Sequence, residues 1–125
     1  MFKLFKTNKK LPPFAVLKAF PDKDKYFRRI ASWVESGDYG IIVTDPNAPR
    51  IITMDPWPQL VFLAADGQRT IEQYIYYMAG QYTGKVPDKL DETIIHEIGT
   101  LQQERLIELC DTQKRPEPRF DQPGK

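Results

Sequence analysis

The chain has 125 residues, of which 41% are hydrophobic and 28% are charged, a composition typical of a soluble globular protein with one core. Its formal net charge of +1 argues against strong, sequence-independent attraction to nucleic acid, which needs an excess of Lys and Arg on one face. The one cysteine, Cys110, excludes an internal disulfide. Because the sequence also lacks a signal peptide and a run of about twenty apolar residues, we expect a cytoplasmic protein without a membrane span.

The first eleven residues are basic. MFKLFKTNKK carries four lysines but no apolar stretch of the kind that a signal peptide needs, so we expect residues 1–11 to be flexible and solvated. The alternative is that the apolar side chains of this segment touch a membrane surface or an acidic partner. Residues 12–20, which begin with two prolines, show a weak pattern for a strand.

Residues 20–37 present two competing patterns. Phe27, Ile30, Ala31 and Val34 recur at helical spacing, which predicts an extra helix in the N-terminal part of the domain. Alternation within residues 28–34 predicts a strand instead. The helix is the preferred prediction for residues 22–36, and the strand is the alternative.

Two short β-rich runs, residues 40–44 (GIIVT) and residues 50–54 (RIITM), flank the sequence DPNAP. The prolines and the asparagine between the runs suit a turn, so we expect a β-hairpin. β-Branched residues dominate both runs. At least one face of the hairpin is therefore expected to be buried.

A helix is expected to follow the hairpin directly. Asp55 suits its N-cap position and Pro56 suits its first turn. We expect its inner surface to consist of Leu60, Val61, Leu63 and Ala64.

The sequence DGQRT (66–70) predicts a tight corner between this helix and a second one. Gly67 can adopt the left-handed conformation that ends a helix. Thr70 is a good N-cap residue for the next helix, and Gln73 three residues later completes a capping box.

Second and third helices are expected over residues 70–82 and 88–110. Each has an apolar stripe at helical spacing, and the acidic residues near the start of the third helix favour a helix N-terminus. The stripe of the second helix is Ile71, Tyr74, Ile75, Met78 and Tyr82. The stripe of the third is Leu90, Ile94, Ile98, Leu101 and Leu109. We expect Ile71, Ile75, Met78, Ile94, Ile98 and Leu101 to form one buried core with Leu60 and Leu63.

A hairpin followed by three short-linked helices predicts an α+β, winged-helix-like domain over residues 12–110. Its expected parts are a small hairpin or three-stranded sheet, a three-helix bundle and the extra N-terminal helix. Residues 111–125 mix prolines with charge, which predicts a disordered C-terminal tail.

No catalytic or cofactor motif is recognisable in the sequence. His96 is the only histidine, and Glu92 is its one partner at helical spacing, whereas a metal site needs three or four ligands. Cys110 has no candidate base beside it, and the glycines do not have the spacing of a phosphate-binding loop. We therefore expect a protein that is not an enzyme and that binds neither metal nor cofactor.

Tyrosines are concentrated in the second predicted helix. Tyr74 and Tyr82 fall on its core stripe, whereas Tyr76 and Tyr77 fall on the margin. Tyr76 and Tyr77 are therefore either half-buried rings with hydroxyls in water or a surface for a partner protein.

The segment LAADGQRTIE (63–72) is similar to a pattern of the PqqD-like proteins, also called RiPP recognition elements: an apolar pair, Asp-Gly, Arg-Thr and an aliphatic residue. The order of hairpin, helix, corner, helix and helix extends this resemblance over residues 41–109. Members of that family are small winged-helix-like domains that hold precursor peptides for modifying enzymes. Asp55 stands where the family often has Asn, whereas Pro56 and Trp57 depart from its usual polar pair.

The resemblance implies that a leader-like peptide adds as a strand to the last strand of the small sheet, beside the third helix. The peptide-binding residues that it implies in this chain are Arg50, Ile51, Ile52, Thr53, Met54, Ile94, Ile98, Leu101 and Arg105. The implied partners are a precursor or leader-like peptide and a modifying enzyme.

Two other functions compete with peptide binding. A winged-helix nucleic-acid-binding protein would need outward basic residues on its helices. The second predicted helix has none and the third has only Lys89 and Arg105. The other alternative is an interaction scaffold that binds a folded partner through Tyr76 and Tyr77.

Overall fold

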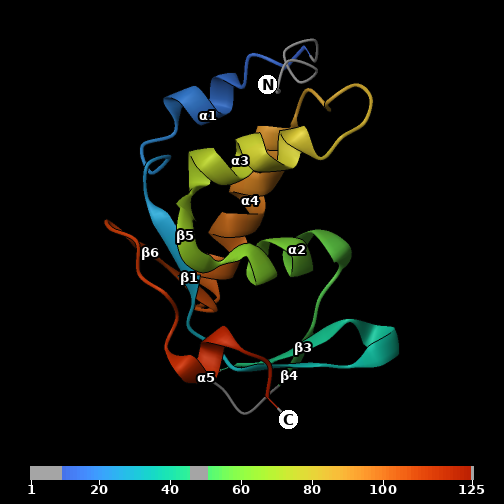
Figure 1. Ribbon diagram of the computed structural model, residues 1–125, viewed down its shortest axis with the longest axis vertical. Coiled ribbons are helices and arrows are strands. Elements are labelled where there is room, and N and C mark those ends of the chain that lie inside the picture. The colour runs from blue at the N-terminus through green and yellow to red at the C-terminus, as the bar shows by residue number, and fades with distance from the viewer. Residues whose placement is uncertain (1–9, 46–50, 125) are drawn as a thin grey trace, which may run out of the picture.

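The computed structural model describes residues 10–45 and 51–124 (Figure 1). Over these ranges it confirms the predicted α+β class, with two small three-stranded antiparallel sheets and five α-helices. In chain order the elements are α1 (Ala15–Ala19), β1 (Tyr26–Arg29), β2 (Trp33–Glu35), the 3₁₀ helix η2 (Gly37–Tyr39), β3 (Ile41–Thr44), β4 (Ile51–Thr53), α2 (Pro56–Ala64), β5 (Asp66–Thr70), α3 (Ile71–Gly80), α4 (Leu90–Gln103), β6 (Ile107–Cys110) and α5 (Pro118–Asp121).

The first sheet has the strand order β5–β1–β6 and the second has the order β2–β3–β4. Figure 1 shows α2, α3 and α4 grouped beside the first sheet, with the second sheet at the lower end of the molecule. The predicted hairpin is confirmed, because β3 and β4 pair antiparallel. Residues 46–50, which include Arg50 and most of the expected turn, lie outside the described residues.

The helix predicted within residues 20–37 is wrong, since this segment contains strands β1 and β2. Phe27, Arg29, Ala31 and Trp33 are all buried, so burial follows a period of two residues. The helical pattern depended on apolar residues that are only half-buried, such as Ile30. The strand alternative for residues 28–34 was nearer, since β1 and β2 overlap this range, but the burial of the charged Arg29, only 3% exposed, hid which residues face the core.

The weak strand predicted for residues 12–20 is also wrong, because α1 occupies this segment. Phe14 precedes α1 with a φ of 50° and, like Leu17, is buried. The main-chain N–H of Leu17 donates a 3.0 Å hydrogen bond to the carboxylate of Asp91, which is itself buried near the start of α4. This bond holds α1 against α4.

The corner predicted between two helices is instead the strand β5, which pairs with β1. Gly67 does have a positive φ of 75°, but α2 has already ended at Ala64. Gly67 is required by a close approach of the C-terminal segment, because a Cβ there would lie 1.8 Å from the carbonyl oxygen of Lys114. The predicted capping box is confirmed, with bonds of 3.1 and 2.9 Å between Thr70 and Gln73.

The third predicted helix ends earlier than expected. After α4 the chain reverses at Arg105, which has a φ of 61°, and continues as strand β6 paired with β1. The N–H groups of Arg105 and Leu106 bond to the carbonyls of Gln102 and Leu101, which is a Schellman motif with arginine in place of the usual glycine. This closure ends the helix although the apolar pattern of the sequence continues.

The predicted core is confirmed except for its α2 residues. Ile71, Ile75, Ile94, Ile98 and Leu101 are buried in one cluster, against which Met78 is partly buried. Leu60 and Leu63 are 46% and 36% exposed instead, because α2 turns Val61 and Phe62 inward. No helix in the described ranges is long and apolar enough to cross a membrane.

Residues 111–124 differ from the predicted disordered tail. They run from the first sheet to the second, and α5 buries Phe120 on the way.

The carbonyl oxygen of Phe120 accepts 2.9 Å hydrogen bonds from Nε of Arg29 and from Nε1 of Trp33. The Arg29 guanidinium also donates to the carbonyls of Phe62 and Leu63 at the end of α2. Burial of the Arg29 guanidinium lowers its pKa. The carbonyls of Phe120, Phe62 and Leu63 provide the acceptors that a buried guanidinium needs.

Candidate functional site

The hydrogen-bonding direction of each residue in the second sheet follows from two bonds between β2 and β3. Thr44 N–H donates to the Ser32 carbonyl at 2.8 Å, and Ser36 N–H donates to the Gly40 carbonyl at 2.7 Å. Because main-chain groups alternate in direction along an antiparallel strand, Val43 must then bond towards β4. Val43 is paired with Ile52.

The outer edge of β4 therefore exposes the main-chain groups of Ile51 and Thr53. Ile52 directs its N–H and C=O towards β3, so its two neighbours direct theirs away from the sheet. No residue of the described ranges bonds to these outward groups. The edge can thus accept another strand.

A hollow of about 170 Å³ lies beside this edge, between β4 and the C-terminal end of α4. Its apolar lining comes from Ile52 and Met54 on one side and from Leu101 and Leu106 on the other. Asp55, Pro58, Thr53, Thr100 and Glu104 complete the lining. Strand edge and hollow together make a short groove with an apolar floor and a polar rim, called the β4 groove below.

Four of the residues that the resemblance implied line the β4 groove. They are Ile52, Thr53, Met54 and Leu101. Ile51 is 68% exposed and contributes its outward main chain rather than a place in the lining.

The remaining implied residues lie elsewhere. Ile94 and Ile98 are 0% and 1% exposed, so they support α4 from the core and cannot contact a peptide directly. Arg105 follows α4 as an exposed residue outside the lining. Arg50 lies outside the described residues.

Sequence reasoning missed several lining residues, chiefly Thr100, Glu104 and Leu106. We expected the helix to continue to residue 110, so residues 104–106 were assigned to the wrong faces. Pro58 was missed because the inward face of α2 was assigned to other residues. Asp55 and Glu104 make the rim acidic, whereas a basic contact from Arg105 was expected.

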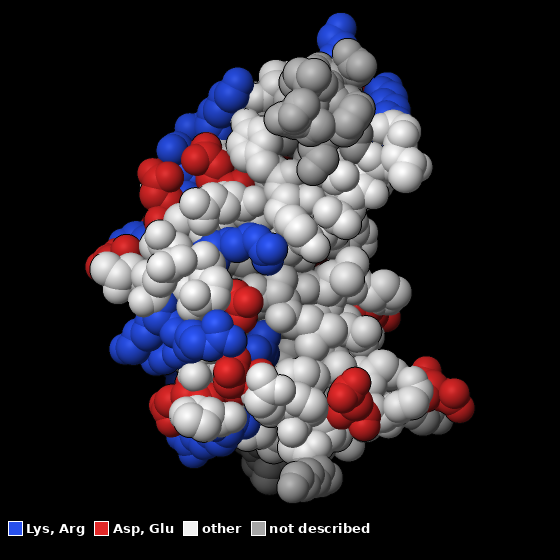
Figure 2. All heavy atoms as spheres, in the orientation of Figure 1, with Lys and Arg blue, Asp and Glu red and all other residues white. Residues whose placement is uncertain are grey.

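A second hollow, of about 490 Å³, lies between α2 and α3. Tyr77 lines it and is 44% exposed, whereas Tyr76 lies outside the lining and packs edge-on against Phe14 with ring centroids 5.5 Å apart. Tyr74 also lines the hollow, and burial raises its pKa to about 12. The face over α2 and α3 is mostly uncharged (Figure 2). Of the two tyrosines expected at a partner surface, Tyr77 lines this hollow and Tyr76 does not.

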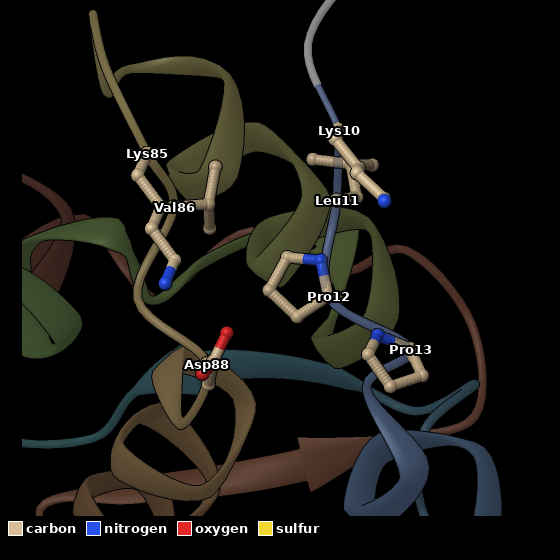
Figure 3. Close-up of a pocket in the computed structure, with 7 residues that line it drawn as sticks. All are labelled: Lys10, Leu11, Pro12, Pro13, Lys85, Val86 and Asp88. Carbon is tan, nitrogen blue, oxygen red and sulfur yellow. The ribbon is translucent and has the colours of Figure 1, made fainter.

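A third hollow, of about 330 Å³, lies where the chain leads into α1 (Figure 3). Pro12 and Pro13 line one side, and Lys85, Val86 and Asp88 line the other. Its charged groups are two lysines, Lys10 and Lys85, and one carboxylate, Asp88, all on exposed residues. These exposed side chains of both signs do not define a site for an ion.

The described residues contain no group of three His, Cys, Asp or Glu side chains that could hold a metal ion. Burial, followed by the charge of Glu108, raises the pKa of Cys110 and so lowers the fraction of reactive thiolate. His96 is an exposed residue of α4. The chemistry that the site offers is thus main-chain hydrogen bonding beside an apolar surface.

No family model, no curated protein and no solved structure matches the chain. A function therefore has to be assigned from this geometry.

Proposed function

We propose that the protein is a non-enzymatic peptide-binding module, similar in function to the PqqD-like proteins, that holds a leader-like peptide by strand addition at β4 for a maturation enzyme. The observation that carries the proposal is the outward main chain of Ile51 and Thr53 beside an apolar hollow. An extended peptide can exchange hydrogen bonds with both residues while its side chains alternate between solvent and the hollow.

The size of the β4 groove favours a peptide over a small-molecule ligand. Pockets for small molecules typically enclose about 300–1,000 Å³, whereas this hollow encloses about 170 Å³. A hollow of this size suits one apolar side chain of a longer ligand that is held by its main chain. Ile52, Met54, Leu101 and Leu106 would surround that side chain.

The arrangement of elements supports the same proposal. The second sheet precedes α2, α3 and α4 in the chain, as the resemblance implies, although β5 lies between α2 and α3. Strands β1, β5 and β6 are additions to that plan. Neither α3 nor α4 contains a Lys or Arg, so the helices that would enter a nucleic-acid groove carry no basic side chain. Peptide binding is therefore preferred to nucleic-acid binding.

The test uses a synthetic peptide with the sequence of a short precursor encoded next to the gene. Thr53→Pro removes the outward N–H but no bond to β3. We expect it to weaken binding at least about tenfold, because hydrogen bonding and the fit of the added strand are both lost. Thr53→Val, which keeps the N–H, should bind within about threefold of the parent.

Isothermal titration calorimetry measures the affinities, and circular dichroism must show that both variants are folded. A folded Thr53→Pro protein that binds as tightly as the parent refutes strand addition at β4. A neighbourhood that encodes no precursor peptide and no modifying enzyme would also count against the proposal.

A further inference from the structure

The hollow between α2 and α3 lies on a different side of α2 from the β4 groove. Pro58 borders the β4 groove, whereas Leu60 and Leu63 border the second hollow. Successive helical residues are about 100° apart, so Pro58 and Leu60 point in nearly opposite directions. The two surfaces can therefore be occupied at the same time.

Large apolar side chains are exposed around this second hollow. Leu60, Leu63 and Tyr77 are 46%, 36% and 44% exposed, and Met78 lies beside them in the lining. Figure 2 shows the mostly uncharged face that α2 and α3 present to solvent. Apolar side chains gathered in this way are typical of an interaction surface, whereas scattered ones are not.

Arg69 supplies a charge at the edge of the hollow. Its guanidinium lies 4.1 Å from the centroid of the Tyr77 ring, which orients it by a cation–π interaction. No hydrogen bond or ion pair joins that guanidinium to any residue of the described ranges. Asp66 also lines the hollow, where its Oδ1 accepts a bond from the Gln68 N–H and its negative charge acts on the buried guanidinium of Arg29. The planar donors of Arg69 thus remain available for a carboxylate.

We propose that this hollow docks a protein partner that inserts a large apolar side chain beside a carboxylate. The apolar side chain would cover Leu60, Leu63 and Met78, and the carboxylate would accept bonds from Arg69. This docking site goes beyond peptide binding at β4, and it gives the module a separate face for a folded enzyme.

The test uses two capped peptides, acetyl-Leu-Trp-Glu-amide and acetyl-Leu-Trp-Gln-amide, titrated into the full-length ¹⁵N-labelled protein. The Glu peptide should shift the amide signals of Leu63, Arg69 and Tyr77, with a Kd on the order of 1 mM for so small a ligand. The Gln peptide should bind at least about threefold more weakly, because it lacks the charge that pairs with Arg69.

Arg69→Gln should abolish the difference between the two peptides. Lys18→Gln, which removes one exposed positive charge on α1, should preserve it. Equal affinities of the two peptides for the parent protein would overturn the proposal, as would shifts that avoid α2 and α3. Shifts at Ile51 and Thr53 alone would overturn it while leaving peptide addition at β4 intact. Failure of the precursor peptide to bind would instead overturn the β4 proposal alone.

Discussion

The two edges of the second sheet differ in what covers them. At the β2 edge, Gly124 N–H donates a 2.7 Å hydrogen bond to the Trp33 carbonyl, and Gly124 forms a parallel bridge with Val34. At the β4 edge, the outward groups of Ile51 and Thr53 meet no residue of the described ranges. One edge is thus closed by the chain itself, whereas none of the described residues covers the other.

This difference shows how one sheet can be protected and receptive at once. An uncovered strand edge pairs readily with other chains, so proteins usually cover or interrupt it. Here the C-terminal segment covers β2 and is fixed by Phe120, Arg29 and Trp33. The described residues of the C-terminal segment cover β2 and not β4. The apolar hollow lies beside β4, so a strand added there would also gain side-chain contacts.

The largest effect is expected from loosening the covered edge. Phe120→Ala should lower the free energy of unfolding by about 3–5 kcal/mol, because the ring is only 8% exposed. Urea denaturation followed by circular dichroism measures the change. Gln122→Ala, an exposed neighbour, should change stability by less than about 0.5 kcal/mol. Equal small effects of both variants would show that the C-terminal segment does not hold the sheet.

Proline substitutions test the directions of the main-chain groups on β4. Ile52→Pro removes a bond to β3, whereas Thr53→Pro removes only the outward N–H. Ile52→Pro should therefore destabilise the protein by about 2 kcal/mol more than Thr53→Pro, as measured by thermal unfolding. The reverse order would mean that the two residues face the opposite way and that Ile52 lies at the open edge.

A smaller effect is expected from removing one bond at the β2 edge. Gly124→Pro eliminates the donor to Trp33 and should cost about 1 kcal/mol. Amide exchange at Glu35, whose N–H points towards this edge because Val34 bonds to β3, should accelerate correspondingly. Gly124→Ala keeps the donor and brings its Cβ to 3.3 Å from Val34, a contact that a small shift relieves. Unchanged exchange in Gly124→Pro would show that this bond does not protect the edge.

The smallest change concerns the end of α4, which walls the β4 groove. Arg105 has a φ of 61°, and glycine adopts this conformation without strain. Arg105→Gly should stabilise the protein by about 0.5 kcal/mol in chemical denaturation, because the relieved strain exceeds the extra entropy that glycine loses. Because Arg105 lies outside the groove, its removal should leave peptide affinity within about twofold. A large loss of peptide affinity would show that Arg105 belongs to the binding site after all.

Local signals in the sequence predicted the parts of the fold that local chemistry determines. The β3–β4 hairpin follows from two β-branched runs around a turn, and the start of α3 follows from the Thr70–Gln73 capping box. The position of β4 beside the third helix was implied by the resemblance. The β4 groove accordingly contains most of the strand residues expected there.

The rest of the fold depends on contacts between distant segments. β5 has the sequence DGQRT, which contains few strand-forming residues, and it becomes a strand because β1 and the C-terminal segment lie beside it. Strand β1 was concealed by the buried Arg29, whose acceptors lie 33 to 92 residues away in the chain. Because α4 ends early, Glu104 and Leu106 line the groove, whereas Arg105, which was expected there, does not.

The most direct test of the central claim is amide hydrogen exchange along β4, followed by NMR with and without the synthetic precursor peptide. Without peptide, the Ile52 amide should exchange slowly, because it bonds to β3, and the Thr53 amide should exchange rapidly. Saturating peptide should slow exchange at Thr53 at least about tenfold, since a new hydrogen bond and exclusion of water protect it. Saturable binding without any added protection at Thr53 and Ile51 would contradict strand addition at this edge.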